Sequence, residues 1–189
     1  MQEFEKKLML SKEAYDHLRQ NICQDARSVS QTNYYFDTDD FSMNKRGVTC
    51  RIRQKNGVYK ATIRNHSVQK LDCSIEEDLA EKSYFDLNTF SSLGIHLQGD
   101  LITERIVVFA DNTCEMVLDR NIYLGTVDDE LEIEYLLGFE EKATGLLNEI
   151  IDKLLHQGFD VSREEIRNKS KSERFFARKS LQSSINHQK

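Results

Sequence analysis

The sequence contains no proline and no tryptophan, and only eight of its 189 residues are glycine. Segments rich in glycine, serine and proline, which commonly link domains, are therefore missing. Without such a linker, and at this length, we expect a single domain over residues 1–180. Residues 181–189, with the sequence LQSSINHQK, are expected to form a flexible tail.

The sequence also lacks long apolar runs and an excess of basic residues, which argues against a membrane protein and against a nucleic-acid-binding protein. The chain has no apolar run of about 18 residues, so no transmembrane helix is predicted and no membrane partner is expected. Its 26 basic residues are outnumbered by 32 acidic ones. This balance argues against nucleic acid as a partner, because such binding requires a basic surface. A net charge of −6 remains compatible with a local basic pocket.

The four cysteines and five histidines form no recognisable motif. No two cysteines have the C-x-x-C spacing of a zinc site, and no signal peptide is recognised before them. We therefore expect free thiols in a reducing compartment and a cytoplasmic protein. The scattered histidines are expected at the surface or in loops; they are His17, His66, His96, His156 and His187.

Hydrophobic periodicity predicts an α+β fold dominated by one sheet with mostly antiparallel neighbours. Eight strands are expected, at 2–10, 32–38, 47–54, 58–65, 70–78, 101–110, 113–119 and 130–137. Asn56-Gly57 between two of these strands is a strong hairpin signal. Helices are expected after Ser11, over about 86–93, over EEKATGLLNEIIDKLLHQG and, briefly, after Lys171.

Charged side chains alternate along several predicted strands, although one face of a half-buried strand is normally apolar. Arg51 and Arg53 flank Ile52, and Glu132 and Glu134 flank Ile133. A solvated strand face explains any single pattern of this kind. The charges are sorted by strand, however, and like charges placed side by side need compensation. In a closed barrel of about eight strands, basic and acidic faces would meet around a polyanion pocket with a place for Mg²⁺ or Mn²⁺.

The opening MQEFEKKLML contains Glu3-Phe4-Glu5-Lys6-Lys7, which resembles the ExExK signature of the CYTH, or triphosphate tunnel metalloenzyme, superfamily. The similarity continues in family order through QTNYYFDT, RIR, YKATIRN, LEIEY and NKSKSERF, over about residues 1–176. It is greatest to small CYTH proteins of Gram-positive bacteria that are labelled adenylate cyclase-like. The resemblance implies a closed eight-stranded antiparallel β-barrel with flanking helices, which forms a tunnel for triphosphate and a divalent metal.

The resemblance also implies roles for individual residues. The implied metal ligands are Glu3, Glu5, Glu132 and Glu134. The implied phosphate contacts are Lys7, Arg51, Arg53, Arg64, Arg105 and Lys171. Arg64 stands where the family more often has lysine, so its charge is kept and its geometry changed. The roles of four further residues stay open; they are Glu76, Asp78, Asp119 and Lys169.

These residues lead us to expect a metal-dependent hydrolase of small molecules that carry a triphosphate, with inorganic triphosphate first among them. Water would attack the terminal phosphorus, with Mg²⁺ or Mn²⁺ as cofactor. Glu5 and Lys7 are the expected catalytic residues. Lys7 would contact phosphate or, alternatively, act as a general base, because burial among cations lowers the pKa of a lysine.

Several alternatives remain open at this point. Thiamine triphosphate is another candidate substrate, and a long polyphosphate is a candidate if both tunnel ends are open. An adenylate cyclase of class IV type is the second candidate activity, although no residue here is assigned to adenine. Tyr34, Tyr35 and Phe36 could stack on a base, but packing is the favoured interpretation. A non-catalytic sensor of phosphorylated ligands and a homodimer are also left open.

Overall fold

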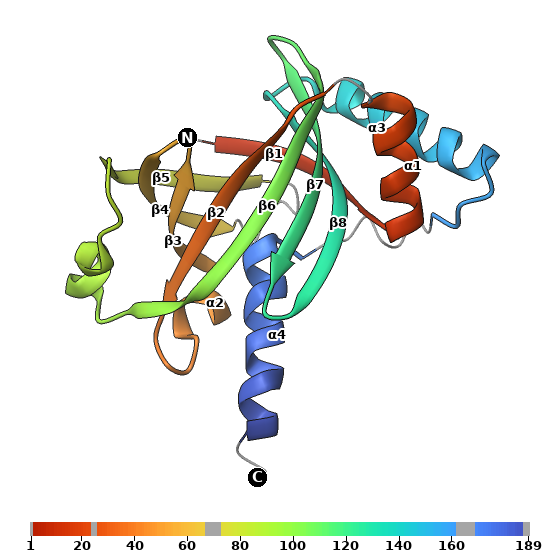
Figure 1. The fold of residues 1–189 in the computed structure, drawn as a ribbon. Coiled ribbons are helices and arrows are strands. Elements are labelled where there is room, and N and C mark those ends of the chain that lie inside the picture. The colour runs from red at the N-terminus through yellow and green to blue at the C-terminus, as the bar shows by residue number, and fades with distance from the viewer. Residues whose placement is uncertain (1, 24–25, 67–72, 162–168, 187–189) are drawn as a thin grey trace.

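The computed structural model describes residues 2–23, 26–66, 73–161 and 169–186 of the chain (Figure 1). Eight strands are described: β1 (Gln2–Leu10), β2 (Ser28–Asp37), β3 (Val48–Lys55), β4 (Val58–His66), β5 (Cys73–Lys82), β6 (His96–Ala110), β7 (Cys114–Tyr123) and β8 (Thr126–Tyr135). The helices in the same ranges are α1 (Lys12–Ile22), α2 (Ser42–Lys45), the 3₁₀ helix η1 (Leu87–Leu93), α3 (Glu140–His156) and α4 (Lys171–Asn186). None of these helices is long and apolar enough to cross a membrane.

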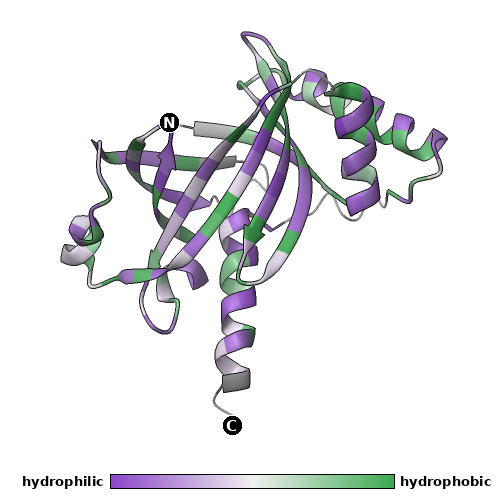
Figure 2. Cartoon of the chain, viewed as in Figure 1, coloured by the Kyte–Doolittle hydropathy of each residue, from purple (hydrophilic) through white to green (hydrophobic). Residues whose placement is uncertain are grey.

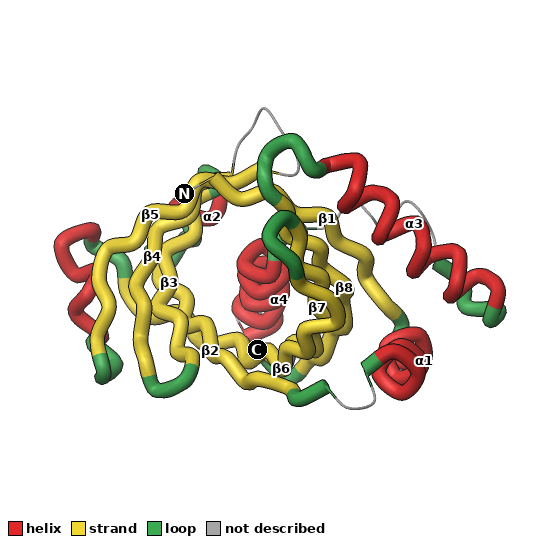
Figure 3. The backbone as a smooth tube through the Cα atoms, turned by 90° about the horizontal axis from the view of Figure 1, so that it is seen from above, coloured by secondary structure: helices red, strands yellow, loops and turns green. Residues whose placement is uncertain are grey.

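The strands pair in the order β1-β5-β4-β3-β2-β6-β7-β8, and β8 pairs with β1, which closes the sheet into a barrel (Figure 3). All of these pairings are antiparallel. The β1–β5 seam is short, with three residue pairs, whereas β1 and β8 pair over seven. The predicted eight-stranded antiparallel sheet with flanking helices is confirmed. Counted round the barrel in either direction, β2 is the strand farthest from β1, and β3 is the strand farthest from β8.

Helices α1 and α3 cover the outside of the barrel beside β1 and β8 (Figures 1 and 3). The side chain of Ser11 caps α1 by accepting a hydrogen bond from the backbone N–H of Ala14 at 3.1 Å. The apolar stripe of α3, which includes Leu147, Ile150 and Leu154, is buried against the same cluster as Leu8 of β1. Hydrophilic and hydrophobic residues alternate along much of the length of the barrel strands (Figure 2). The apolar core therefore lies largely outside the barrel wall, which leaves the interior for polar side chains.

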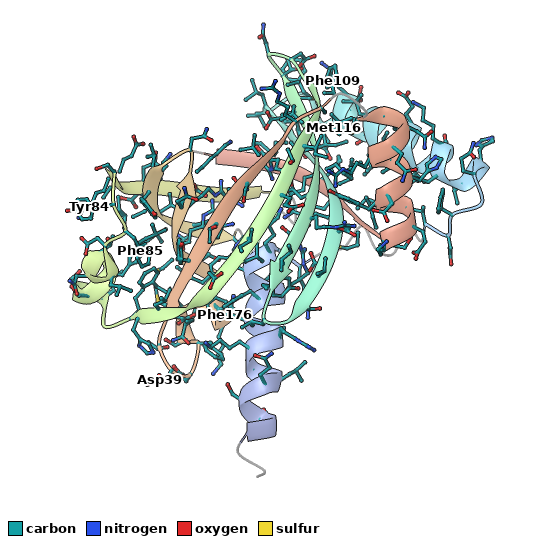
Figure 4. The ribbon with its side chains drawn as sticks, viewed as in Figure 1. Asp39, Tyr84, Phe85, Phe109, Met116 and Phe176 are labelled. Atoms are coloured by element: carbon teal, nitrogen blue, oxygen red, sulfur yellow. The ribbon has the colours of Figure 1, made fainter. Side chains whose placement is uncertain are left out.

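Helix α4 enters one end of the barrel (Figures 1 and 3). Phe175 is fully buried there, with its ring centroid 4.9 Å from that of Tyr35 on β2 and 6.3 Å from that of Tyr123 on β7. Gly99 of β6 has φ of +145°, and a Cβ at this position would come within 3.0 Å of the Phe175 ring. Figure 4 shows Phe176 at this end and Phe109 with Met116 at the opposite end.

Several element boundaries differ from the prediction. The last helix is longer than the brief one expected after Lys171, and it includes residues 181–186 of the segment expected to form a tail. Residues 187–189 lie outside the described ranges. Strand β6 begins at His96 rather than near 101, because it pairs with β2 as far as the partners Asp37 and His96. Helix α2 was not predicted, and residues 87–93 form a 3₁₀ helix.

Candidate functional site

A cavity of 210 Å³ lies inside the barrel. Its charged lining consists of seven cationic side chains, Lys7, Arg51, Arg53, Lys55, Arg64, Arg105 and Lys171, and four carboxylates, Glu5, Glu115, Glu132 and Glu134. The formal charge of this lining is therefore positive, although the chain as a whole carries −6. A cavity of this kind attracts anions by a local field.

The cationic and acidic groups occupy different walls. Three of the cations, Arg51, Arg53 and Lys55, lie on β3, and Arg64 lies on the neighbouring β4. The carboxylates come from β1, β7 and β8, with β8 across the barrel from β3. All six residues predicted to contact phosphate line this one cavity, as do Glu5, Glu132 and Glu134. Glu3 pairs with Ser74 through its backbone, but its side chain lies outside the described part of the chain.

Lys171 forms the centre of the acidic side. Its ammonium nitrogen lies 2.9 Å from Asp119, 2.7 Å from Glu130 and 2.8 Å from Glu132. Carboxylate oxygens of these three acids lie within 4.8 Å of one another, and all three side chains are buried. Burial alone would raise the pKa of Glu132, but the cations around it, led by Lys171 and Lys7, hold it well below its usual value. Positive charge on Lys171 thus holds these three acidic side chains together.

Glu130 is a residue of this cluster that the sequence reasoning left without a role. Burial would raise its pKa, but Lys171 and Arg174 lower it to about 2. Arg174 donates a hydrogen bond to Glu130 at 2.9 Å, whereas the second oxygen, Oε2, has no hydrogen-bond partner among the described residues. The alternation of Glu130, Glu132 and Glu134 along one strand was the signal that could have identified it.

Asp119, whose role was open, is fully buried on β7. Arg105 holds it through two hydrogen bonds, of 2.9 and 2.7 Å, and also contacts Glu132 at 2.7 Å and Glu134 at 3.4 Å. Arg105 therefore joins three carboxylates across β7 and β8. Lys169, the other open candidate next to Lys171, is exposed and does not line the cavity.

Lys7 is surrounded by acids rather than by cations. Its ammonium nitrogen lies 2.9 Å from Glu132 and 3.2 Å from Glu5. Burial would lower the pKa of Lys7, but Glu132 and Glu5 raise it above the usual lysine value. The expectation that neighbouring cations lower this pKa, and so prepare Lys7 as a general base, is therefore wrong. For Glu5, burial raises the pKa, an effect that Lys7 partly offsets.

One carboxylate, that of Glu76, holds two arginines of the basic wall in place. Glu76 of β5 lies 2.6 Å from Arg51 and 3.0 Å from Arg64. Asp78 instead pairs with Lys60 at 2.8 Å, and its side chain is 62% exposed. Of these two acids, Glu76 is therefore the one that contacts cavity-lining arginines. Its two fixed arginines present preformed donors to an anion.

His66 also lines the cavity, which corrects the expectation of a surface or loop position. It is the last residue of β4, and its Nε2 lies 3.4 Å from the hydroxyl of Thr49. Burial and the nearby Arg64 lower the pKa of His66 to about 4. The imidazole is therefore neutral near pH 7. Thr49 in turn contacts Ser172 of α4 at 2.8 Å, so a hydroxyl chain joins β3 to the start of α4.

The aromatic residues of β2 are used for packing, as expected. Ring centroids lie 4.4 Å apart for Tyr34 and Phe85, and 5.0 Å apart for Phe36 and Phe90. Tyr35 packs against Phe175 of α4 and is 1% exposed. All three rings thus pack against aromatic side chains from other parts of the fold.

Comparisons with known proteins agree with this architecture. Residues 1–174 match the family model described as "CYTH domain". The "Putative triphosphatase YjbK" of Bacillus subtilis is 29% identical over 187 residues, covering 88% of this chain and 91% of that protein. The crystal structure of a "putative adenylate cyclase" from Bacillus halodurans is 25% identical with a TM-score of 0.65, covering 92% of this chain and 97% of its own.

A third similar structure is that of the "Putative adenylyl cyclase HpAC1" from Hippeastrum, which is described as revealing a dominant triphosphatase activity. It is 19% identical, with a TM-score of 0.66, and covers 93% of this chain and 95% of its own. At this identity the likeness concerns the fold alone. With the family model spanning residues 1–174, the chain belongs to the CYTH domain family.

Proposed function

We propose that this protein is a divalent-metal-dependent hydrolase of small molecules that carry a triphosphate, with inorganic triphosphate as its substrate. The observation that carries this proposal is the single cavity in which a basic wall on β3 and β4 faces carboxylates on β1, β7 and β8. A phosphate chain requires cations around its oxygens, whereas carboxylates beside it require a metal to be tolerated. Similarity to the putative triphosphatase of Bacillus subtilis supports the same reading.

The buried acidic cluster has the donor set of a hard divalent cation, which would take the place that the Lys171 ammonium occupies between the three carboxylates in this structure. Mg²⁺ and Mn²⁺ prefer carboxylate oxygens, and oxygens of Asp119, Glu130 and Glu132 lie within 4.8 Å of one another. The Oε2 atom of Glu130 is buried and has no hydrogen-bond partner among the described residues, so it is available to coordinate a metal. Glu132 belongs both to this cluster and to the ligand set expected from the sequence, whose other members are Glu3, Glu5 and Glu134. When bound, the metal would supply positive charge that draws phosphoryl oxygens and offsets charge in the transition state.

The chain's own cations would hold the rest of the phosphate oxygens. We assign this role to the predicted set of Lys7, Arg51, Arg53, Arg64, Arg105 and Lys171. Because Glu76 already fixes Arg51 and Arg64, these two side chains lose little further freedom on binding. Fixed donors of this kind stabilise the charge that develops during phosphoryl transfer.

No nucleophilic side chain is required for this reaction. Glu5 lines the cavity and its pKa is raised by burial, which suits a carboxylate that orients the attacking water and accepts its proton. Lys7 stays protonated beside Glu5 and Glu132, so it acts as a donor to phosphate oxygens. The catalytic pair expected from the sequence is thereby kept, with the proton-accepting role given to Glu5.

Phosphate release tests the proposal directly. Purified protein is given inorganic triphosphate, ATP or thiamine triphosphate, each with Mg²⁺, with Mn²⁺ and with chelator. We expect rapid metal-dependent release from inorganic triphosphate and little from ATP. Conversion of ATP to cyclic AMP, or no turnover of any of these compounds, would overturn the proposal.

Two variants locate the activity. Glu5→Gln keeps the shape of the side chain and removes its charge, and we expect it to abolish turnover while the folded content, measured by circular dichroism, is unchanged. Glu77→Gln is the matched control, because Glu77 is exposed on β5. Full activity in the Glu5 variant would exclude Glu5 from the mechanism.

A further inference from the structure

Strand β2 carries two buried side-chain amides, Gln31 and Asn33, that the proposed mechanism does not use. Their side chains are buried, with 2% and 0% exposed. The amide nitrogens, Nε2 of Gln31 and Nδ2 of Asn33, have no hydrogen-bond partner among the described residues. Buried donors without partners destabilise a folded protein, so two of them on one strand indicate that an acceptor belongs there.

Both amides lie on the interior face of β2, two positions apart, next to the basic wall. In the β2–β3 pairing, Gln31 is opposite Lys55 and Asn33 is opposite Arg53. Gln31 lines the cavity directly. Asn33 is joined to the lining through Arg53, whose Nε donates a hydrogen bond to the Asn33 carbonyl oxygen at 2.9 Å. This bond fixes which end of the Asn33 amide remains available for another partner.

Arg53 and Lys55 differ from the other cations of the lining. Among the described residues, neither has a carboxylate within the 4.0 Å of an ion pair, whereas the other five lining cations each have at least one. Arg53 is also deeply placed, and burial, together with Arg51 and Arg105, lowers its pKa to about 10. Its positive charge therefore has no ion-pair partner among the described residues.

This wall lies across the barrel from the acidic cluster. Strand β2 is farthest from β1, and β3 is farthest from β8, which carries Glu130 and Glu132. A metal on the acidic side would hold one end of a phosphate chain. The other end, which has no metal, would then lie near β2 and β3. Neutral amide donors beside one arginine suit that end, because phosphoryl oxygens accept several hydrogen bonds.

We propose that Gln31, Asn33 and Arg53 form a subsite for the terminal phosphoryl group that lies opposite the metal. The subsite deepens the proposed function and rests on it, because it assigns one end of the phosphate chain to each wall. Arg53 supplies charge, and the two amides supply directed donors that fix the orientation of the group. Without ligand, the two donors are a cost to stability that binding relieves.

Two substitutions in the full-length chain test the amides. Gln31→Met keeps the length of the side chain and removes its donors. Asn33→Asp keeps the oxygen that Arg53 uses and replaces the free donor with negative charge. Binding of inorganic phosphate, pyrophosphate and triphosphate is measured by calorimetry with Mg²⁺, and every chain, the wild-type reference included, carries Glu5→Gln to prevent turnover. Thermal unfolding is measured without ligand. Gln54→Met is the matched control, because Gln54 points from β3 to the opposite face.

We expect each variant to weaken triphosphate binding at least tenfold, while the midpoint of unfolding stays equal or rises. The control is expected to change neither quantity. Wild-type affinity in both variants would overturn the subsite and leave the triphosphatase proposal standing. A lower midpoint with unchanged affinity would likewise overturn it, because the amides would then be structural groups bonded through water.

The three probes separate failure of the subsite from failure of the proposed function. If the wild type binds phosphate or pyrophosphate but not triphosphate, and Gln31→Met removes that binding, the subsite holds and the triphosphate substrate is wrong. If the wild type binds none of the three, both proposals are overturned.

Discussion

The ammonium nitrogen of Lys171 lies 2.7 Å from a carboxylate oxygen of Glu130, and the two side chains are 11% and 0% exposed. The same nitrogen contacts Asp119 and Glu132 at 2.9 and 2.8 Å. The first residue of α4 thereby holds together acids from β7 and β8. Loss of one member of such a buried group leaves the others without compensation.

Lys171→Met should therefore reduce the free energy of unfolding by about 3–5 kcal/mol. Chemical denaturation measures this change, and added Mg²⁺ should restore part of it by replacing the missing charge. Lys153→Met is the control, since Lys153 pairs with Glu149 at the surface of α3 and exposed pairs contribute about 0.2–1 kcal/mol. Equal stability of the Lys171 variant and the wild type would contradict the interpretation.

Glu130 and Glu134 distinguish two possible sets of metal ligands. The apparent affinity for Mg²⁺ or Mn²⁺ can be measured from the rise in the unfolding midpoint that each metal causes. Glu130→Gln should lower this affinity at least tenfold, because it removes charge from the buried cluster. Glu134→Gln should have a smaller effect, since Glu134 is 44% exposed and lies 3.4 Å from Arg105. The reverse order would favour the set of Glu3, Glu5, Glu132 and Glu134 expected from the sequence.

His66 should make the protein less stable in acid. Its folded-state pKa of about 4 lies below the unfolded value of 6.5, so the unfolded chain binds the proton first as pH falls. Stability is thus fully present above pH 6.5 and declines toward pH 4, by about 2 kcal/mol after allowance for partial exposure.

His66→Gln should flatten the dependence of unfolding free energy on pH in that range, as followed by denaturation at a series of pH values. His156→Gln, on the exposed side of α3, is expected to leave the wild-type slope. A slope that survives the His66 substitution would assign the acid sensitivity to other groups.

Gly99 is required by the close approach of α4. Gly99→Ala places a Cβ about 3.0 Å from the Phe175 ring at a φ of +145°, and should cost about 1–3 kcal/mol of stability. Hydrogen exchange of the α4 amides should accelerate, because the helix packs less closely against β6. Gly145→Ala in α3 meets no neighbour and should instead stabilise the protein by about 0.5–1 kcal/mol. Unaltered exchange in α4 would contradict this role of Gly99.

The alternation of charge along the strands predicted which charged side chains share a face of one strand, such as Arg51 and Arg53. The closed barrel, and the meeting of Lys7, Arg105 and Lys171 in one site, were expected from the resemblance to the CYTH family. The pattern could not predict that acids surround Lys7, because that depends on how β1 registers against β8. It also could not show that Gln31 lacks a partner, since satisfaction of a buried amide is a property of the assembled interior.

The end of the chain shows the same limit. From residue 181 the sequence is polar and lacks a strong apolar stripe, so local pattern predicts no stable helix. What fixes α4 lies earlier in it, where Phe175 and Phe176 are buried against the barrel. Packing at its first turns continues the helix to Asn186.

Phe175 of α4 packs against residues of β2, β6 and β7, so α4 blocks the end of the barrel that it enters. A polymer of phosphates could not be threaded through from one side to the other. It would have to enter with a terminus foremost and withdraw by the way it came. Such a polymer would then be hydrolysed from its ends. Products of internal cleavage of the polyphosphate would not accumulate.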